Sequence, residues 1–373
     1  MTEESYADAL DLSEYDYESL VEKLQRREHE GTEYRYVPDY NTKVERGTVL
    51  IDSEVVRGFP KVPRTLVLSE GIPRYFDGDV VVEEKMNGYN TRVARVDDET
   101  LAFSRSGIVC PFTTKFLRRV YGDELDALLD ERPGATVCGE MIGRDNPYTA
   151  HDYEEVDSLD LRVFDVRDAR TGESVPVEER RALCDEHGLP SVPYHGTHPV
   201  DEAVDAVRDA IEELDERGRE GVIMKTPDVS SQLKYTTSAA NQGDLAYAFS
   251  LPFDYGQSFM FRRIIREAFQ SHEYDDEEEH KERARSLGES ILTSMVDTVE
   301  RIDDGEEVGE RHTVRAAPDE VEALLDHLRG MGLQLVIEED RQEGDERFVE
   351  FVKKTQATND KTATYLDGHI VRE

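Results

Sequence analysis

Seven short segments between residues 78 and 240 combine runs of apolar, often β-branched residues with charged ones, and they constrain the fold more than any other feature. Runs of this length bounded by Gly, Pro, Asn and Asp are typical of β-strands. The segments are DVVVEEK (79–85), NTRVARV (90–96), LAFSRSG (101–107), ATVCGEMI (135–142), LRVFDVRD (161–168), GVIMK (221–225) and QLKYTT (232–237). Helical patterns interrupt them at 178–187 and 201–217. The sequence therefore predicts an α+β fold with mainly antiparallel sheets.

The regions on either side have different patterns. Residues 14–28 carry apolar residues at helical spacing, and residues 33–69 read as short strands broken by Pro and Gly. After residue 242 the spacing becomes helical, and from about residue 311 a strand, a helix and two further strands follow. We expect four units: an N-terminal α/β module at 1–65, the strand-rich domain at 66–242, a helical region at 243–308 and a small C-terminal α/β domain at 309–373.

Apolar residues lie three and four positions apart in the helical segments between residues 253 and 302. Their apolar faces are broad enough to bury against a second subunit in a two-fold homodimer, or to pack onto the rest of the same chain. The pattern alone is compatible with both arrangements. The residues concerned are Phe261, Ile264, Ile265, Ala268, Leu287, Ile291, Met295, Val299 and Ile302.

The formal net charge of the chain is −39, with 84 acidic and 45 basic residues. A hydrophobic content of 37% and periodic patterns along the whole length argue against a disordered acidic chain. Because Asp, Glu and Arg dominate and lysines are few, we expect a halophilic protein adapted to molar salt. At about 1 M salt the Debye length is about 3 Å, so the net charge does not exclude RNA or DNA as a partner.

The three cysteines, Cys110, Cys138 and Cys184, are scattered and lack CxxC spacing, which argues against a disulfide framework or a zinc site. No apolar stretch is long enough to cross a membrane, and the first residues, MTEESYADALDLSE, are acidic and polar. We therefore expect a cytoplasmic protein that has reduced cysteines and does not contact a membrane.

The first of the seven strands ends in a lysine, Lys85, where another apolar residue would suit a buried strand. Strand alternation places Glu83 and Lys85 on one face, and Gly88 allows the backbone to come close to a ligand. Lys85 alone could be a strand-end residue whose amine reaches water. Similar residues recur, however, in the other apolar segments, so chance is a poor explanation for all of them together. They are Arg105 in SRSG, Glu140 in VCGEMIG, Phe164 in LRVFDV, Glu220 and Lys225 in EGVIMK, and Lys234 in QLKYTT.

The order KxxG, SRSG, GE, FD, EGVIMK and LKYT over residues 80–240 resembles the motif series of the covalent nucleotidyltransferase superfamily, which contains DNA ligases, RNA ligases and mRNA capping enzymes. The forms EEKMNGYN, SRSG and LKYTT, with a helical C-terminal region, most closely resemble the archaeal homodimeric ATP-dependent RNA ligases. The resemblance implies that residues 66–242 form an adenylyltransferase catalytic domain with ATP-grasp-like antiparallel sheets. It also implies that the helical region, at residues 253–302, forms a homodimer.

The resemblance further implies that Lys85 attacks the α-phosphate of ATP and that the AMP then moves to an RNA 5′-phosphate. A 3′-hydroxyl would expel the AMP, which joins two RNA ends or closes a circle. A lysine amine must be neutral to attack, although the pKa of a free lysine is about 10.4. Burial and nearby cations lower such a pKa. Lys225 and Lys234 could supply those cations while holding the α-phosphate.

Phosphoryl transfer of this kind needs a divalent ion, Mg²⁺ or Mn²⁺, which prefers carboxylates, phosphate oxygens and water. Glu140 and Glu220 are the candidate ligands, although the resemblance gives these positions either ribose or metal contacts. Arg105 resembles the arginine that contacts the ribose or the 5′-phosphate.

Three further residues are candidates for the nucleotide site. Phe164 resembles the aromatic residue that stacks on adenine, or else it is an ordinary core phenylalanine. Glu83, or the backbone at Glu84, would read the adenine amino group. Arg92 would approach the phosphates, or else lie at a strand edge.

Two rival functions remain. ATP-dependent DNA ligases and capping enzymes carry an OB-fold after the LKYT-like motif, which should appear as five short strands, whereas residues 253–302 have a helical pattern. A nucleotide-binding protein with an inactive nucleotidyl fold is the second rival. It is disfavoured because every polar position that the chemistry requires is filled.

Overall fold

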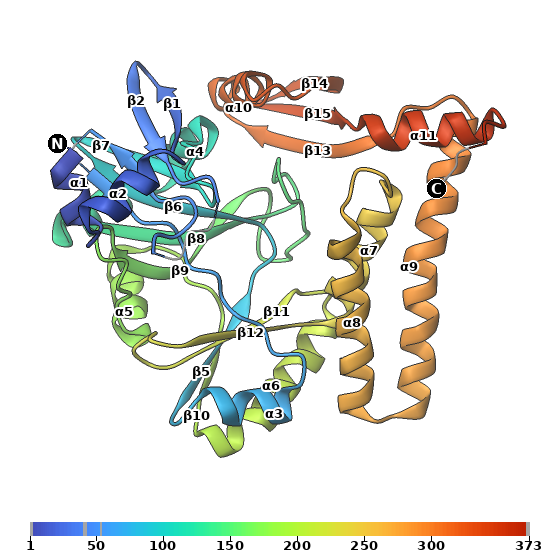
Figure 1. Ribbon diagram of the computed structural model, residues 1–373, viewed down its shortest axis with the longest axis horizontal. Coiled ribbons are helices and arrows are strands. Elements are labelled where there is room, and N and C mark those ends of the chain that lie inside the picture. Colours follow the sequence, from blue (N-terminus) through green and yellow to red (C-terminus); the bar gives the residue numbers. More distant parts are fainter. Residues whose placement is uncertain (1–2, 40–42, 53, 371–373) are drawn as a thin grey trace.

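A computed structural model describes residues 3–39, 43–52 and 54–370 of the chain (Figure 1). Its N-terminal part combines short helices with an antiparallel sheet in the order β1-β2-β3-β4. The elements are α1 (Glu3–Ala9), α2 (Glu14–Val21), β1 (Gln25–His29), β2 (Thr32–Tyr36), β3 (Val49–Ile51) and β4 (Glu54–Val56). The helix predicted at 14–28 ends at Val21, because residues 25–29 pair with β2 as a strand.

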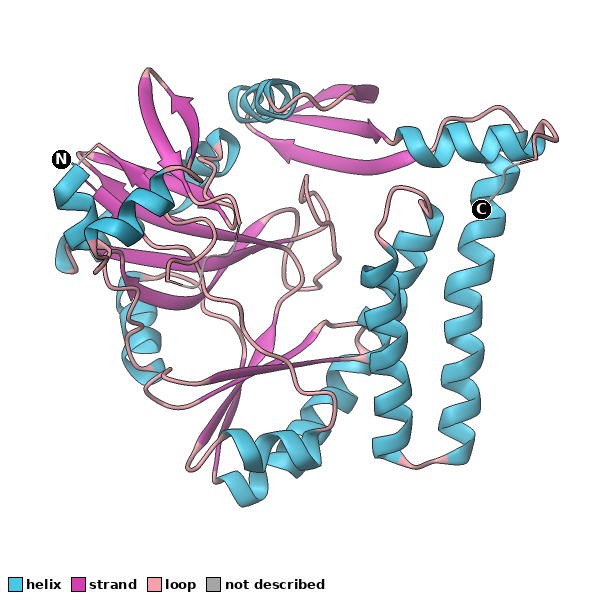
Figure 2. Ribbon diagram, in the orientation of Figure 1, coloured by secondary structure: helices cyan, strands magenta, loops and turns pink. Residues whose placement is uncertain are grey.

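Two four-stranded antiparallel sheets form the core, in the orders β7-β6-β8-β9 and β10-β5-β11-β12 (Figure 2). Their strands are β5 (Val80–Lys85), β6 (Tyr89–Val96), β7 (Glu99–Ser104), β8 (Ala135–Ile142), β9 (Asp160–Asp168), β10 (Tyr194–His198), β11 (Gly221–Lys225) and β12 (Gln232–Thr236). The sheets contain all seven segments predicted from the sequence. The predicted α+β class with antiparallel sheets is confirmed.

Helices cover the outer faces of both sheets. α3 (Leu68–Tyr75) and α6 (Val200–Glu216) share a buried apolar cluster with β5, β11 and β12, whereas α4 (Pro111–Glu131) and α5 (Val177–His187) pack with β6, β8 and β9. The expectation of short strands throughout residues 33–69 is wrong for RTLVL (64–68), because this segment forms only a single β-bridge before α3 begins.

The helix α4 was not expected from the sequence pattern. The backbone at Tyr121 is non-helical (φ −132°), so the helix is kinked in the middle. The apolar residues on either side of Tyr121 therefore do not follow one continuous helical period. Both halves are nevertheless buried against the sheet, through Phe112 and Leu117 on one side and Leu125 and Leu128 on the other.

The helical region follows β12 directly and consists of α7 (Ser238–Ser250), α8 (Gln257–Tyr274) and α9 (Glu277–Asp303). α8 and α9 are connected by a tight turn, in which Asp275 is left-handed (φ 48°) and Asp276 caps α9 by accepting from two backbone N–H groups. The predicted helical character of 253–302 is confirmed. Within the described residues, no helix is both long and apolar enough to span a membrane.

The C-terminal part forms a three-stranded antiparallel sheet in the order β13-β15-β14, with one helix against it and one after it. The elements are β13 (Gly309–Ala316), α10 (Pro318–Gly330), β14 (Leu335–Glu343), β15 (Glu346–Lys354) and α11 (Gln356–Leu366). α10 packs on α4, where Arg119 pairs with Glu320 at 2.7 Å and Lys115 with Asp319 at 2.8 Å. This contact closes the upper side of the molecule in Figure 1.

Candidate active site

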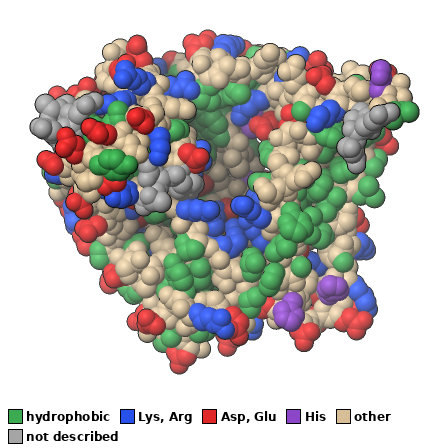
Figure 3. Space-filling view, in the orientation of Figure 1, with side chains coloured by type: hydrophobic (Ala, Val, Ile, Leu, Met, Phe, Trp, Pro, Cys, Tyr) green, Lys and Arg blue, Asp and Glu red, His purple; other side chains and the backbone are tan. Residues whose placement is uncertain are grey.

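A pocket lies between the two core sheets, and the space-filling view shows a hollow in the centre of the molecule (Figure 3). The empty space in the pocket is about 640 Å³, counting the part that is open to solvent. The lining residues are Phe59, Val62, Glu83, Glu84, Lys85, Met86, Asn90, Arg105, Glu140, Phe164, Val192, Ile223, Lys225, Gln232 and Lys234.

Strand register explains why several charged residues meet on one wall of this pocket. Along β5, β11 and β12, Lys85 lies opposite Gly221 and Thr236, Glu83 lies opposite Ile223 and Lys234, and Val81 lies opposite Lys225 and Gln232. Residues that pair across strands and alternate along them share one face of a sheet. The other face carries apolar residues that pack on α3 and α6, which holds this wall in place.

Lys85 forms an ion pair with the residue that precedes its opposite strand. Its Nζ lies 2.5 Å from Oε2 of Glu220, and both side chains are about one fifth exposed (23% and 19%). Gly221, which follows Glu220, has φ 140°, and a Cβ there would lie 2.3 Å from the Tyr235 carbonyl oxygen. Only glycine fits this conformation and this close strand approach, so the EGVIMK sequence places Glu220 beside Lys85.

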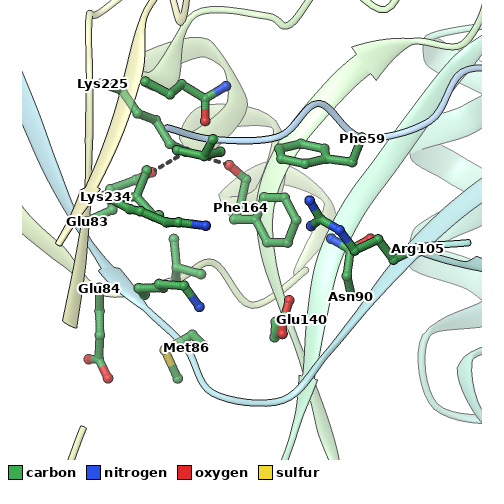
Figure 4. A pocket seen from close by; sticks show the side chains of 15 residues that line it. Phe59, Glu83, Glu84, Met86, Asn90, Arg105, Glu140, Phe164, Lys225 and Lys234 are labelled. Carbon is green, nitrogen blue, oxygen red and sulfur yellow. Dashed lines mark hydrogen bonds and ion pairs between the residues drawn. The ribbon is translucent and has the colours of Figure 1, made fainter. Parts of the chain in front are cut away.

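Glu83, Lys225 and Arg180 form a buried ionic group at one end of the pocket, where Figure 4 shows Glu83 and Lys225. Lys225 Nζ lies 2.8 Å from Glu83 Oε2 and donates to the Phe164 carbonyl at 2.9 Å, and Arg180 donates to Glu83 Oε1. Burial favours the neutral carboxyl, but the charges of Lys225 and Arg180 outweigh burial and lower the pKa of Glu83. The sequence did not single out Arg180, because it comes from α5.

Lys234 and Glu140 both have shifted pKa values. Burial, together with the charges of Arg64, Lys85 and Arg105, lowers the pKa of Lys234 to about 8. Burial raises the pKa of Glu140 to about 7, although Lys85 and Arg105 act in the opposite direction, and nearby Glu220 raises it further. Groups that titrate near neutral pH inside a pocket are typical of catalytic sites.

Aromatic rings form a second wall of the pocket. The rings of Phe164 and Phe59 meet edge to face with centroids 5.1 Å apart, and Arg167 lies over Phe59 at 5.2 Å. Figure 4 shows both rings facing the pocket. Phe59, in the segment GFPK of the N-terminal part, is a lining residue that the sequence pattern does not predict. A phenylalanine between Gly and Pro was the only available signal.

Two predicted site residues are placed differently. Arg92 is fully buried and does not line the pocket; its guanidinium donates to the carbonyl oxygens of Arg57, Gly47 (2.7 Å) and Ser104 (3.0 Å). The prediction that it approaches the phosphates is wrong, because these carbonyls surround its charge. Gly88 allows a close approach to protein: a Cβ there would lie 2.0 Å from the Met141 carbonyl oxygen.

Glu84 lies on the opposite face of β5 from Glu83. Its carboxylate faces Arg219 at 3.6 Å, and its backbone N–H already donates to the Pro193 carbonyl at 2.9 Å. An amino group donates, so the backbone group of Glu84 that could read the adenine amino group is its carbonyl, and this expectation stays a prediction. Glu83 remains in the pocket, because its side chain is on the same face as Lys85.

Glu140, which lines the pocket, and Glu220, which pairs with the lining residue Lys85, are carboxylates of the kind that bind a divalent ion. Glu140 has no ion-pair partner within 4 Å in the described part of the chain, and Glu220 is near enough to raise the pKa of Glu140. A magnesium-like ion commonly takes one or two carboxylates and completes its shell with phosphate oxygens and water. Among the described residues, no group of three or more His, Cys, Asp or Glu is arranged to hold a metal ion by itself.

Comparisons with known proteins cover the whole chain. A family model described as RNA ligase matches residues 78–237, and one described as the C-terminal region of the ligase Pab1020 matches residues 247–369. An uncharacterized protein of Methanocaldococcus jannaschii is 38% identical, with 96% of this chain and 91% of that protein covered.

Two solved structures are similar over their full length. One is described as an archaeal ATP-dependent RNA ligase; it is 38% identical, covers 100% of both chains and has a TM-score of 0.93. The other, from Aquifex aeolicus, is described as a putative ATP-dependent DNA ligase; it is 26% identical, covers 96% of this chain and 100% of that chain, and has a TM-score of 0.89.

Proposed function

The chain belongs to the family of archaeal ATP-dependent RNA ligases, and we propose that it joins RNA 5′-phosphate and 3′-hydroxyl ends through a lysyl-AMP on Lys85. The observation that carries this proposal is the position of Lys85. Its amine lies in a pocket with an aromatic wall for a base, cations for phosphate and a carboxylate at 2.5 Å.

In the first transfer, the neutral amine of Lys85 attacks the α-phosphorus of ATP, a P–N bond forms, and pyrophosphate leaves. Glu220 is placed to take the proton from the amine, because its oxygen already lies within hydrogen-bond distance. Lys234 is cationic below a pKa of about 8 and stabilises the charge that develops on the phosphate. Lys225 holds Glu83 and the Phe164 backbone instead, so its role is to shape the adenine end.

The adenine is proposed to bind between the aromatic wall and Glu83. Phe164 offers the stacking surface, supported by Phe59. The oxygens of Glu83 each accept from one cation and keep further lone pairs, with which they can accept from the adenine amino group. Arg105 lines the same pocket and is proposed to contact the ribose or a phosphate.

Glu140 and Glu220 would hold a divalent ion, which we propose is Mg²⁺ or Mn²⁺. When bound, such an ion neutralises charge on the transferring phosphate and orients it. Glu140 is ionised, and hence a good ligand, above its pKa of about 7.

In the second transfer, an oxygen of the RNA 5′-phosphate attacks the α-phosphorus, the P–N bond breaks, and Lys85 recovers a proton. In the third, a 3′-hydroxyl attacks the RNA phosphate and AMP leaves. The last step depends mainly on positioning, since AMP is a good leaving group. When both ends belong to one RNA, the product is a circle.

RNA rather than DNA is the proposed substrate because the 38% identical full-length match is described as an RNA ligase and residues 253–302 are helical rather than an OB-fold. The competing function is DNA joining, which the description of the Aquifex aeolicus structure favours. Matched 5′-phosphorylated RNA and DNA strands, offered with ATP, decide between them. Exclusive sealing of nicked DNA duplex would overturn the RNA proposal.

We also infer a halophilic homodimer that works in the cytoplasm. α9 is 27 residues long, yet Thr298 is its one buried residue. The exposed apolar residues on α8 and α9 are Phe261, Phe269, Leu292, Val296 and Val299. A helix with so little buried surface gains stability from a second subunit, and Figure 3 shows apolar side chains gathered over this side of the molecule.

The central experiment is the intact mass after incubation with ATP and Mg²⁺ or Mn²⁺. The wild-type protein should gain the mass of one AMP, and Lys85→Ala should gain none. No adduct on the wild-type protein would leave only a nucleotide-binding role, and an adduct on Lys85→Ala would place the chemistry elsewhere.

A further inference from the structure

Two cations that line the pocket and two that lie beside it have no carboxylate oxygen within 4 Å in the described part of the chain. The lining pair is Arg105 and Lys234, and the neighbouring pair is Arg64 and Arg266. Unpaired arginines are unexpected in a chain with 84 acidic and 45 basic residues. Arg263, on the same helix as Arg266, is paired with Asp244 at 2.6 Å. Figure 3 shows Lys and Arg side chains gathered along the lower edge of the central hollow.

Arg64 is fixed beside the catalytic sheet. Its backbone bridges to Lys234: Thr65 N–H donates to the Lys234 carbonyl at 3.2 Å, and Lys234 N–H donates to the Pro63 carbonyl at 3.0 Å. The Arg64 guanidinium donates to the Thr236 hydroxyl at 2.7 Å. Thr236 lies opposite Gly221, which lies opposite Lys85. The guanidinium is therefore on the Lys85 side of Lys234, at the opposite end from Lys225.

Arg266 reaches the same place from α8. Its guanidinium donates at 3.2 Å to the side-chain oxygen of Asn241, which also accepts from the Thr236 hydroxyl at 3.3 Å. α8 is held against β12 because the side-chain amide of Gln270 donates to the Thr236 carbonyl at 2.5 Å. Burial, together with the charge of Arg266, lowers the pKa of Arg64 to about 10.

Phosphoryl transfer to and from Lys85 brings two phosphate groups in turn to the same side of the transferring phosphorus. The attacking and leaving groups lie roughly in line on opposite sides of the transferring phosphorus. When Lys85 attacks, pyrophosphate leaves on the side away from it; when Lys85 leaves, the RNA 5′-phosphate attacks from that same side. Both groups are phosphate anions, and both occupy one place in turn.

We propose that Arg64 and Arg266, together with Lys234, form the anion site that holds the leaving pyrophosphate in the first transfer and the attacking RNA 5′-phosphate in the second. The inference rests on the proposed ligase function and deepens it. Guanidinium groups suit this role because they stay charged and bind phosphate through two N–H groups.

The test uses the full-length protein after it has formed lysyl-AMP, with Arg64→Ala and Arg266→Ala as variants. One arm measures the pyrophosphate concentration at which the removal of AMP from Lys85 is half-maximal. The other arm compares the affinities of RNA with a 5′-phosphate and the same RNA with a 5′-hydroxyl. Each variant should need about tenfold more pyrophosphate and lose most of its preference for the 5′-phosphate. Arg→Lys variants should recover part of both.

Arg285→Ala is the matched control, since Arg285 is exposed on α9 and pairs with Glu282 of its own helix. It should change neither arm. The affinity for AMP, measured before adenylation, should stay within about twofold in all variants, which also shows that they are folded. An equal loss of AMP affinity would overturn the proposal, as would a loss in only one of the two arms. A wild-type protein without lysyl-AMP would instead contradict the proposed function.

Discussion

Lys85 Nζ and Glu220 Oε2 lie 2.5 Å apart, and the pair joins the ends of two neighbouring antiparallel strands. Lys85 is the last residue of β5, and Glu220 immediately precedes β11. The two side chains therefore have little freedom to separate. Such a pair keeps the amine directed into the pocket and gives its proton an acceptor.

We predict that Glu220→Gln slows formation of lysyl-AMP by about 10- to 100-fold. The amide keeps the size of the side chain but can neither pair with the ammonium nor take its proton. A hydrogen bond to a charged group contributes about 1.5–3 kcal/mol, and about 1.4 kcal/mol corresponds to tenfold in rate. Single-turnover adenylation, followed by intact mass, measures the effect. A rate within about twofold of wild type would remove Glu220 from the proposed mechanism.

The affinity for ATP should fall as the pH rises through about 8, because Lys234 is then losing its charge. Bound phosphate stabilises the charged form of Lys234, so the affinity for ATP should decrease by up to about tenfold per pH unit above pH 8. The measurement uses Lys85→Arg, which keeps a charge beside Lys234 but cannot be adenylated. Adding Lys234→Arg should flatten the profile, since a guanidinium stays charged. An unchanged slope in that double variant would assign the titration to another group.

Phe164→Ala should weaken ATP binding by about tenfold or more, because stacking of a base on an aromatic ring contributes about 1–3 kcal/mol. Phe59→Ala should act in the same direction but less strongly, since Phe59 meets the edge of Phe164. Calorimetry on a Lys85→Arg background measures both. Phe164→Tyr is the matched control and should retain most of the affinity. Equal affinities for the alanine variant and the control would place the adenine elsewhere.

The sequence predicts those parts of the site that follow from strand alternation. Glu83 and Lys85 share a face because side chains alternate, and the register of β11 and β12 adds Lys225 and Lys234 to it. The sequence does not predict Arg180, Phe59 or Arg64 as site residues, because these come from a helix and from irregular segments with no periodic signal.

The environment of Arg92 and the helix α4 are two further features that the local sequence pattern does not predict. Arg92 lies inside β6 and Arg105 directly follows β7. Three backbone carbonyls surround the Arg92 guanidinium, whereas Arg105 lines the pocket. That difference depends on the positions of Gly47 and Arg57 beside β6 in the folded chain, and no local sequence pattern encodes those positions. Likewise α4 was missed because the kink at Tyr121 divides its apolar period.

Arg92→Met should destabilise the fold rather than impair catalysis. Losing the guanidinium leaves the carbonyl oxygens of Arg57 and Gly47 without a donor in a buried place, whereas the Ser104 carbonyl keeps the Gly107 N–H at 2.9 Å. Because an unsatisfied buried acceptor costs about 1–3 kcal/mol, we expect a loss of at least about 2 kcal/mol in the free energy of unfolding, measured with urea at high salt. Arg95→Met, on the same strand but partly exposed and paired with Asp126, should lose less than about 1 kcal/mol.

The adenylation rate per folded Arg92→Met molecule should stay within about threefold of wild type, because the side chain does not reach the pocket. A stable variant that no longer forms lysyl-AMP would return Arg92 to the site.

Leu292→Glu and Phe261→Glu should convert the proposed homodimer into a monomer. Both side chains are 63% exposed and lie on the helices α9 and α8. A carboxylate buried between two apolar faces would be desolvated without a partner, which costs several kcal/mol. Light scattering in molar salt measures the mass, and Tyr15→Glu, at an 80% exposed position on α2, is the control and should not change it. Since Arg266 and Lys85 belong to one protomer, the monomers should still form lysyl-AMP. A wild-type monomer under these conditions would contradict the dimer itself.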